Sequence, residues 1–263
     1  MPAKRFTLSI AQARQTHDVG HNLREIARFV EMAGAAGADL LVFPECALTG
    51  YGPRHHISTA GFDPDAVEAA LEEARDLARA AGVALVLGTH LPLEGGWSNS
   101  ALLISPKRRV MERYDKAHLY GRDTEYYLAG RALASVHRAG AAKVGMQICF
   151  DVRFPEPFRR LALGGAQVIC VPSLIHGEAD MWKGPVIEGH LRSRAAENGR
   201  FIAFANAAGA TQNVPSMILD PFGRLLAQAR RGSAQLLTAE LDLKLVSDDY
   251  LRCRRTDLYG KGG

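Results

Sequence analysis

The sequence predicts an α/β protein in which two sheets stack face to face between two layers of helices. Strand-like apolar runs alternate with amphipathic helical segments along the 263 residues, and the order of these segments repeats in the second half. No linker rich in proline, glycine or serine divides the chain, so we expect one domain over residues 1–263. Two similar halves, each a sheet with helices on one side, can bury their bare faces together in a four-layer α-β-β-α sandwich. A single doubly wound sheet is the alternative, because strand order is not visible in a sequence.

The elements of the first half follow from apolar periodicity and from signals at helix ends. Asp63 and Pro64 supply an N-cap and a first-turn proline for one helix, and Gly82 ends it. In chain order we expect a strand at 6–12, a helix at 22–36, a strand at 40–44, a helix at 64–81, a strand at 83–88 and a hairpin of 101–104 with 110–114.

The second half repeats this order with a recognisable sequence match. Residues 165–172 (GAQVICVP) correspond to residues 37–44 (GADLLVFP), and each segment follows an alanine-rich helical stretch. The remaining elements expected there are a strand at 143–148, a helix at 187–198, a strand at 201–205 and a hairpin over 217–225.

Composition excludes several classes of protein. Apolar residues make up 47% and charged residues 23% of the chain, which is typical of a globular protein that buries a full core. The net charge of +4 comes from basic and acidic residues scattered along the chain, so we expect no nucleic-acid partner. No signal-peptide pattern and no run of about 18 apolar residues occurs, and we therefore expect no membrane partner and a cytoplasmic location.

The cysteines and histidines do not predict a metal or a disulfide framework. The 4 cysteines are far apart and lack CxxC spacing. His90, His118 and His190 have no metal-ligand spacing between them. We therefore expect no metal and no cofactor, and a reducing compartment that keeps a catalytic thiol free.

Three polar residues directly follow predicted strands. Glu45 comes after the strand that ends in Val42-Phe43-Pro44, Lys116 follows the strand of the first hairpin, and Cys149 ends the apolar strand 143–148. Strand ends are where α/β proteins build their sites. Taken singly, each residue has a simpler interpretation as a solvated acid, a surface lysine or a small buried side chain. Their conjunction favours a shared site.

Together these three residues supply what a cysteine hydrolase requires. Such an enzyme needs a nucleophile, a proton acceptor that later returns the proton, and a donor for the developing oxyanion. A thiol titrates near ~8.5 and is mostly protonated at neutral pH, so Cys149 needs a base, and Glu45 can serve. Lys116 can stabilise negative charge on both Cys149 and Glu45. A pair of opposite charges ~4 Å apart is worth roughly 4 kcal/mol at an effective dielectric constant of 20.

The sequence resembles the nitrilase superfamily of carbon-nitrogen hydrolases over nearly its whole length. The matching pieces, in order, are 43–45 with 48–51, 114–120 continuing to Gly130, 145–156, 194–199 leading to 205–209, and 216–223. The resemblance implies the four-layer sandwich, a catalytic triad of Glu45, Lys116 and Cys149, and assembly as a homodimer or larger homo-oligomer.

The resemblance also implies a second acid after the lysine, at the position occupied by Asp123. Glu125 is the nearest glutamate, and the segment is polar enough for both side chains to be solvated. Asp123, Glu125 or neither therefore remain open for this role, which is to orient Lys116 and Glu45 or to position the substrate.

The expected reaction is hydrolysis of a small linear amide to an acid and ammonia through a thioester on Cys149. Residues 150–156 (FDVRFPE) are similar to the amidase and carbamoylase branches and differ from the Trp-Glu of nitrile-cleaving members. An N-carbamoyl amidohydrolase, a nitrilase and a catalytically silent binding or scaffold protein of the same fold are the alternatives. Phe150 supplies an oxyanion N–H, and the further candidates for contact with the amide or carbamoyl substrate are Tyr51, Glu125, His176 and Trp182.

Overall fold

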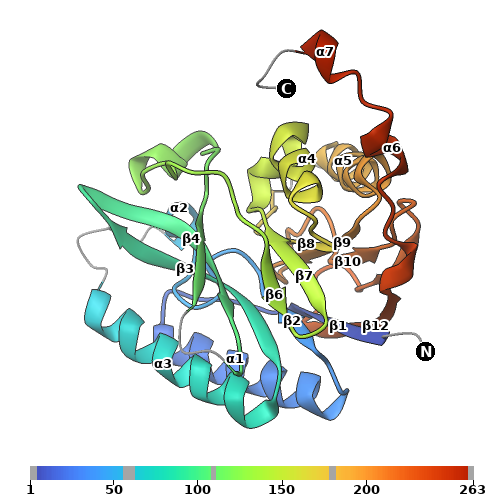
Figure 1. The fold of residues 1–263 in the computed structure, drawn as a ribbon. Helices are drawn as coiled ribbons and strands as arrows, with labels where there is room; N and C mark the ends of the chain where they lie inside the picture. The colour runs from blue at the N-terminus through green and yellow to red at the C-terminus, as the bar shows by residue number, and fades with distance from the viewer. Residues whose placement is uncertain (1–4, 56–62, 108–110, 178–181, 260–263) are drawn as a thin grey trace.

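The computed structural model describes residues 5–55, 63–107, 111–177 and 182–259, and it contains two six-stranded sheets. Figure 1 shows the sheets in the centre of the molecule, with α1 and α3 along one side and α4 and α5 over the other. The predicted four-layer sandwich is confirmed, and the alternative of one doubly wound sheet is wrong, because the strands divide into two separate sheets.

The first sheet has the strand order β12-β1-β2-β3-β4-β5. Its parallel centre is β1, β2 and β3, and β12 and β4 add antiparallel on either side. Its strands are β1 (Arg5–Gln12), β2 (Leu40–Val42), β3 (Ala84–Leu93), β4 (Gly96–Ile104), β5 (Glu112–Asp115) and β12 (Gln235–Asp242).

The second sheet repeats this plan with the order β11-β10-β9-β8-β7-β6. Here β7, β8 and β9 are parallel, while β6 and β10 pair antiparallel at either side of them. Its strands are β6 (His137–Ala139), β7 (Ala142–Met146), β8 (Val168–Ser173), β9 (Phe201–Asn206), β10 (Met217–Leu219) and β11 (Leu225–Gln228).

Helices cover the outer face of each sheet. On the first sheet lie α1 (Val19–Ala35), whose N-cap Asp18 accepts the N–H of His21, and α3 (Pro64–Ala81), which ends at Gly82 in the left-handed conformation. On the second lie α4 (Pro155–Leu163) and α5 (Lys183–Asn198). The short elements are α2 (Gly52–His55), η2 (Gly121–Glu125), η3 (Cys149–Arg153), η5 (Leu243–Leu245), α6 (Asp249–Arg252) and α7 (Thr256–Tyr259).

The core is divided by the first sheet. Within β2, Leu41 belongs to the apolar cluster that includes α1 and α3, whereas Leu40 and Val42 belong to the cluster shared with the second sheet. Alternate residues of a strand point to opposite faces, so this strand is buried on both sides. The short β2 thus holds the residues that follow it between two packed layers.

One segment lies outside this sandwich. The segment with α7 projects away from the body near the C-terminus (Figure 1). No helix in the described part of the chain has both the length and the hydrophobicity needed to span a bilayer.

Candidate active site

The segment after β2 brings Glu45 across the neighbouring strand. It passes over β3 at Gly88, where a Cβ atom would lie 2.4 Å from the carbonyl oxygen of Pro44 and 2.5 Å from the nitrogen of Cys46. The N–H of Leu48 donates to the carbonyl of Gly88 at 3.0 Å and fixes this crossing. Only glycine allows so close an approach of two backbones. Glu45 therefore reaches the sheet interior above β4.

Lys116 connects Glu45 to a second carboxylate. It directly follows β5, and its Nζ donates to Oε1 of Glu45 at 2.7 Å and to Oδ2 of Asp123 at 2.8 Å. All three side chains are at most 1% exposed. A buried charge is tolerated only where it is paired and hydrogen-bonded, and this ammonium has two anionic acceptors.

Two further groups complete the contacts of Glu45. The Nδ2 amide of Asn99, on β4, donates to Oε1 at 2.7 Å, and the backbone N–H of Leu174, after β8, donates to Oε2 at 2.9 Å. Neither residue was predicted from the sequence. The Leu174 amide links the first sheet's carboxylate to the second sheet.

The structure places Asp123, and not Glu125, beside Lys116. Asp123 also accepts the backbone N–H of Tyr120 at 2.9 Å and the hydroxyl of Tyr51. Glu125 is exposed and pairs with Arg122 at 2.9 Å. Both acids lie in η2, but their side chains leave it in different directions.

Cys149 begins η3, separated from the end of β7 by two residues, and has a φ of 45°, in the left-handed region that non-glycine residues rarely occupy. The buried carboxylate of Asp151 holds this turn, accepting the N–H of Ile148 and the hydroxyl of Tyr114 on Oδ2 at 2.9 and 2.8 Å. Its Oδ1 accepts the N–H of His118 at 3.2 Å. The same carboxylate thus ties the cysteine turn to the chain on either side of Lys116.

The electrostatics of the site favour a protonated thiol beside a basic carboxylate. Burial, followed by the charge of Glu45, raises the pKa of the Cys149 thiol well above its ordinary value. Burial raises the pKa of Glu45 as well, with Lys116 and Asn99 acting in the opposite direction. Burial alone would lower the pKa of Lys116, but Glu45, Cys149 and Asp123 raise it far above the ordinary lysine value.

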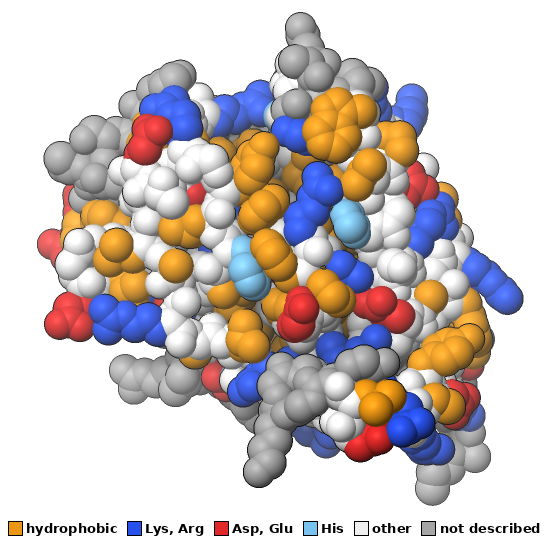
Figure 2. Space-filling view, turned by 90° about the horizontal axis from the view of Figure 1, so that it is seen from above, with side chains coloured by type: hydrophobic (Ala, Val, Ile, Leu, Met, Phe, Trp, Pro, Cys, Tyr) orange, Lys and Arg blue, Asp and Glu red, His pale blue; other side chains and the backbone are white. Residues whose placement is uncertain are grey.

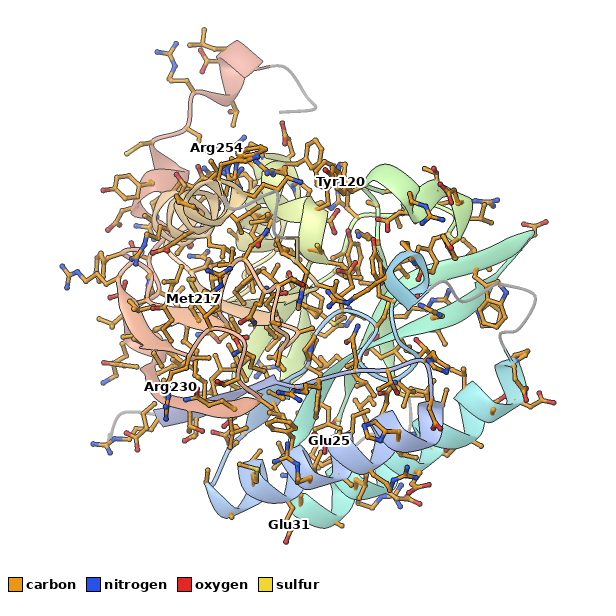
Figure 3. All side chains as sticks on the ribbon, turned by 180° about the vertical axis from the view of Figure 1, so that it is seen from behind. Glu25, Glu31, Tyr120, Met217, Arg230 and Arg254 are labelled. Atoms are coloured by element: carbon orange, nitrogen blue, oxygen red, sulfur yellow. The ribbon has the colours of Figure 1, made fainter. Side chains whose placement is uncertain are left out.

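A pocket of about 160 Å³ opens onto Cys149. Its described lining combines apolar and basic side chains: Tyr120, Phe150, Arg153, Leu174, Ile175, His176, Lys183 and Ile187. Figure 3 shows Tyr120 near the top of the molecule, between the helices of the second sheet and the segment with η2. On the face seen from above, basic and histidine side chains interrupt a band of hydrophobic ones (Figure 2).

The sequence-predicted substrate contacts separate into two groups. Phe150 and His176 line the pocket, and burial and the charge of Arg54 lower the pKa of His176 to about 4, so that its ring is neutral near pH 7. Tyr51 donates its hydroxyl to Asp123 and is not among the described lining residues, and Trp182 is 61% exposed beside Lys183. Neither Trp182 nor Glu125 is among the described lining residues.

No group of three His, Cys, Asp or Glu side chains within the described ranges is arranged to hold a metal ion.

The family model for carbon-nitrogen hydrolases matches residues 7–249. The chain belongs to the carbon-nitrogen hydrolase family. An (R)-stereoselective amidase from a Pseudomonas species is 32% identical over 254 residues, covering 93% of this chain and 89% of that protein. A nitrilase from Pyrococcus abyssi is 30% identical over 252 residues, covering 90% of this chain and 92% of that protein.

Solved structures agree with this carbon-nitrogen hydrolase fold. A double mutant of the amidase from Nesterenkonia sp. AN1, in complex with acrylamide, matches with a TM-score of 0.85 and 28% identity over 98% of this chain and 97% of that chain. Another mutant of that amidase, at 29% identity over 97% of this chain and 95% of that chain with a TM-score of 0.85, shows covalent addition of the acetamide moiety of fluoroacetamide at the active-site cysteine. The predictions of the nitrilase superfamily and of a C–N hydrolase are confirmed.

Proposed function

We propose that this carbon-nitrogen hydrolase is an amidase that converts a small linear amide to an acid and ammonia through a thioester on Cys149. The observation that carries the proposal is one buried ammonium, Lys116, held at 2.7 and 2.8 Å by two carboxylates. The Cys149 thiol interacts electrostatically with Lys116 and Glu45 and lines a pocket. The covalent adduct at the cysteine of the Nesterenkonia amidase supports a cysteine nucleophile.

The first half of the reaction forms the thioester. Glu45 accepts the thiol proton while the sulfur attacks the amide carbonyl carbon, because the raised pKa of the thiol requires a base at the moment of attack. Lys116 and the N–H of Phe150, in the first turn of η3 where the helix offers no acceptor, stabilise the oxyanion. The C–N bond breaks as Glu45 returns the proton to the nitrogen, and ammonia leaves.

The second half consumes water. Glu45 removes a proton from a water molecule that attacks the thioester carbonyl, and the same two donors stabilise the second tetrahedral intermediate. The C–S bond breaks, the sulfur regains the proton and the acid is released. Asp123 keeps Lys116 charged and in place throughout.

The test is ammonia release from a panel of linear amides, N-carbamoyl amino acids and nitriles, followed by intact-mass measurement of the acylated enzyme. An acyl mass on Cys149 and ammonia from amides are expected. Turnover that persists unchanged in Cys149→Ala would refute the nucleophile. Absence of ammonia from every compound, with no acyl mass, would favour a binding or scaffold role.

An N-carbamoyl amino acid amidohydrolase is the second candidate, and Arg153 favours it. This partly buried guanidinium lines the pocket, and it donates to Nε2 of His190 at 3.3 Å. Within the described part of the chain it forms no ion pair with a carboxylate, and none of the described lining residues is acidic. A substrate carboxylate would fit this guanidinium.

We further propose a homodimer or larger homo-oligomer in the cytoplasm as the working form. Membership of the family supports the assembly. Light scattering of the purified protein tests the assembly, and a mass of one chain would refute it.

A further inference from the structure

Asn99 connects the two segments that carry the base and the cation. It lies within β4 and is fully buried. Its Nδ2 donates to Oε1 of Glu45 at 2.7 Å, and its backbone carbonyl accepts the N–H of Lys116 at 2.8 Å. Its Oδ1 accepts the thiol of Cys46 at 3.4 Å, which fixes the orientation of the carboxamide. One residue therefore sets the separation of Glu45 and Lys116.

The contacts of Glu45 divide its two oxygens into different roles. Oε1 has two donors, Lys116 Nζ and Asn99 Nδ2, which occupy both of its lone-pair sites. Oε2 has one donor, the Leu174 N–H at 2.9 Å, and this same amide acts to lower the pKa of the Cys149 thiol. Oε2 is thus the oxygen on the thiol side, and it retains a site for a proton.

We propose that Asn99 is a positioning residue for the reaction, which holds Oε1 of Glu45 so that Oε2 alone exchanges protons with Cys149. This inference rests on the amidase function proposed above and extends it. The backbone bond to Lys116 makes β4 the common reference for both groups. Loss of the Asn99 amide would free Glu45 to rotate, and either oxygen would then accept the proton.

The charges around Glu45 explain why a neutral donor serves here. The titratable groups that face it are Lys116 after β5, Asp123 in η2, Tyr127 after η2, Cys149 in η3, and Cys46 and Tyr51 beyond β2. Lys116 is the cation among them. A second cation in place of Asn99 would hold Glu45 too firmly ionised to accept a proton, whereas an amide orients it with a smaller decrease in its pKa.

A purely structural role for Asn99 predicts different behaviour, and β4 contains a matched control. Ser100 is equally buried in the same strand, but its hydroxyl donates to Asp115 at 2.6 Å on the opposite face of the sheet. Ser100→Ala therefore perturbs the same strand without touching Glu45.

The experiment measures kcat/KM against pH for wild type, Asn99→Ala, Asn99→Asp and Ser100→Ala. Asn99→Asp keeps the side-chain shape but exchanges a donor for an acceptor, so it provides a variant that fills the site if Asn99→Ala does not fold. We expect the acidic limb to move to higher pH in both Asn99 variants, most in Asn99→Asp, with kcat lowered on the order of 10²-fold and KM nearly unchanged. The acidic limb of the kcat/KM profile of Ser100→Ala should coincide with that of wild type.

A second measurement separates this inference from the amidase proposal. The rate of Cys149 alkylation by iodoacetamide against pH reports on the thiol and its base without turnover. If wild type hydrolyses no amide but the Asn99 variants shift the alkylation profile, the proposed function fails and the role of Asn99 stands. If Asn99→Asp hydrolyses amides with an unshifted acidic limb, the role of Asn99 is refuted and the proposed function stands.

Discussion

The two sheets contribute to the site in contrasting ways. The first sheet supplies Glu45, Asn99, Lys116 and Asp123, which are at most 1% exposed and held by side-chain hydrogen bonds of 2.7–2.8 Å. The second supplies Cys149, which is partly exposed and held by backbone conformation, together with most of the described pocket wall. The proposed mechanism thus places proton transfer in a closed region and substrate access in an open one.

This division follows from what each region must do. Buried charges interact strongly and require complete pairing, so a change to one member of the first group affects all of them. The side chains that follow Cys149 face the pocket and can be exchanged while the base and the cation stay in place. Substitutions in the two regions should therefore affect the kinetics in different ways as well as by different amounts.

The largest effect is expected where the two regions meet, at Cys149. Cys149→Ala should lower kcat on the order of 10⁴-fold or more, because no other group can form the thioester. Cys253→Ala is the control, since this thiol is exposed on the C-terminal segment. Ammonia release measures the activity, and intact mass after incubation with an amide should show no acyl adduct on Cys149→Ala. Equal losses of kcat in Cys149→Ala and Cys253→Ala would contradict a specific role for Cys149.

A charge change inside the first region should be nearly as damaging. Glu45→Gln keeps the size of the side chain but removes the proton acceptor, so kcat should fall on the order of 10³-fold. In wild type, the raised pKa of Glu45 means that the base is lost as pH falls through a value above that of an ordinary glutamate. Since the pKa of Lys116 is also raised, its charge persists at alkaline pH. A pH profile of kcat/KM whose acidic limb lies at or below the ordinary glutamate pKa would contradict this account.

The two acids of the short helix η2, Asp123 and Glu125, should differ in their importance for activity. Asp123→Asn removes one of the two carboxylates that hold Lys116, and kcat should fall on the order of 10²-fold through misplacement of the ammonium. Glu125→Gln breaks only an exposed ion pair with Arg122 and should change kcat by less than about twofold. The measurement is kcat of both variants on the same amide. A larger loss of kcat in Glu125→Gln than in Asp123→Asn would assign the role of the second acid to Glu125.

The sequence was most informative where a polar residue directly follows an apolar strand. Glu45, Lys116 and Cys149 could be singled out for that reason, since a strand end fixes the place of the next side chain. Asn99 could not, because it lies inside β4 between two serines and its partner is distant in sequence. The Leu174 contact is made by a backbone N–H, which leaves no signal in residue identity.

The same limits apply to the fold. The helix α1 was predicted from its apolar face, and α3 from its N-cap, first-turn proline and terminal glycine, although α1 begins at Val19 because Asp18 supplies its cap. Two strands, β6 and β12, were not predicted, since β6 has three residues and only two of the eight residues of β12 are buried. Both depend on pairing with β7 and β1, which is a tertiary effect.

The smallest expected effect lies on the open side of the comparison, at Arg153. Arg153→Gln should leave kcat/KM for a neutral amide nearly unchanged but lower it roughly 10-fold, about 1.4 kcal/mol, for an amide or carbamoyl compound with a carboxylate. The reason is that the guanidinium lines the pocket without an ionic partner among the described residues. Trp182→Ala, at an exposed ring beside the pocket, is the control and should alter neither substrate. Equal losses on neutral and anionic substrates would mean that Arg153 affects turnover in general, as the buried residues of the first sheet are expected to do. That result would contradict a role for Arg153 in binding a substrate carboxylate.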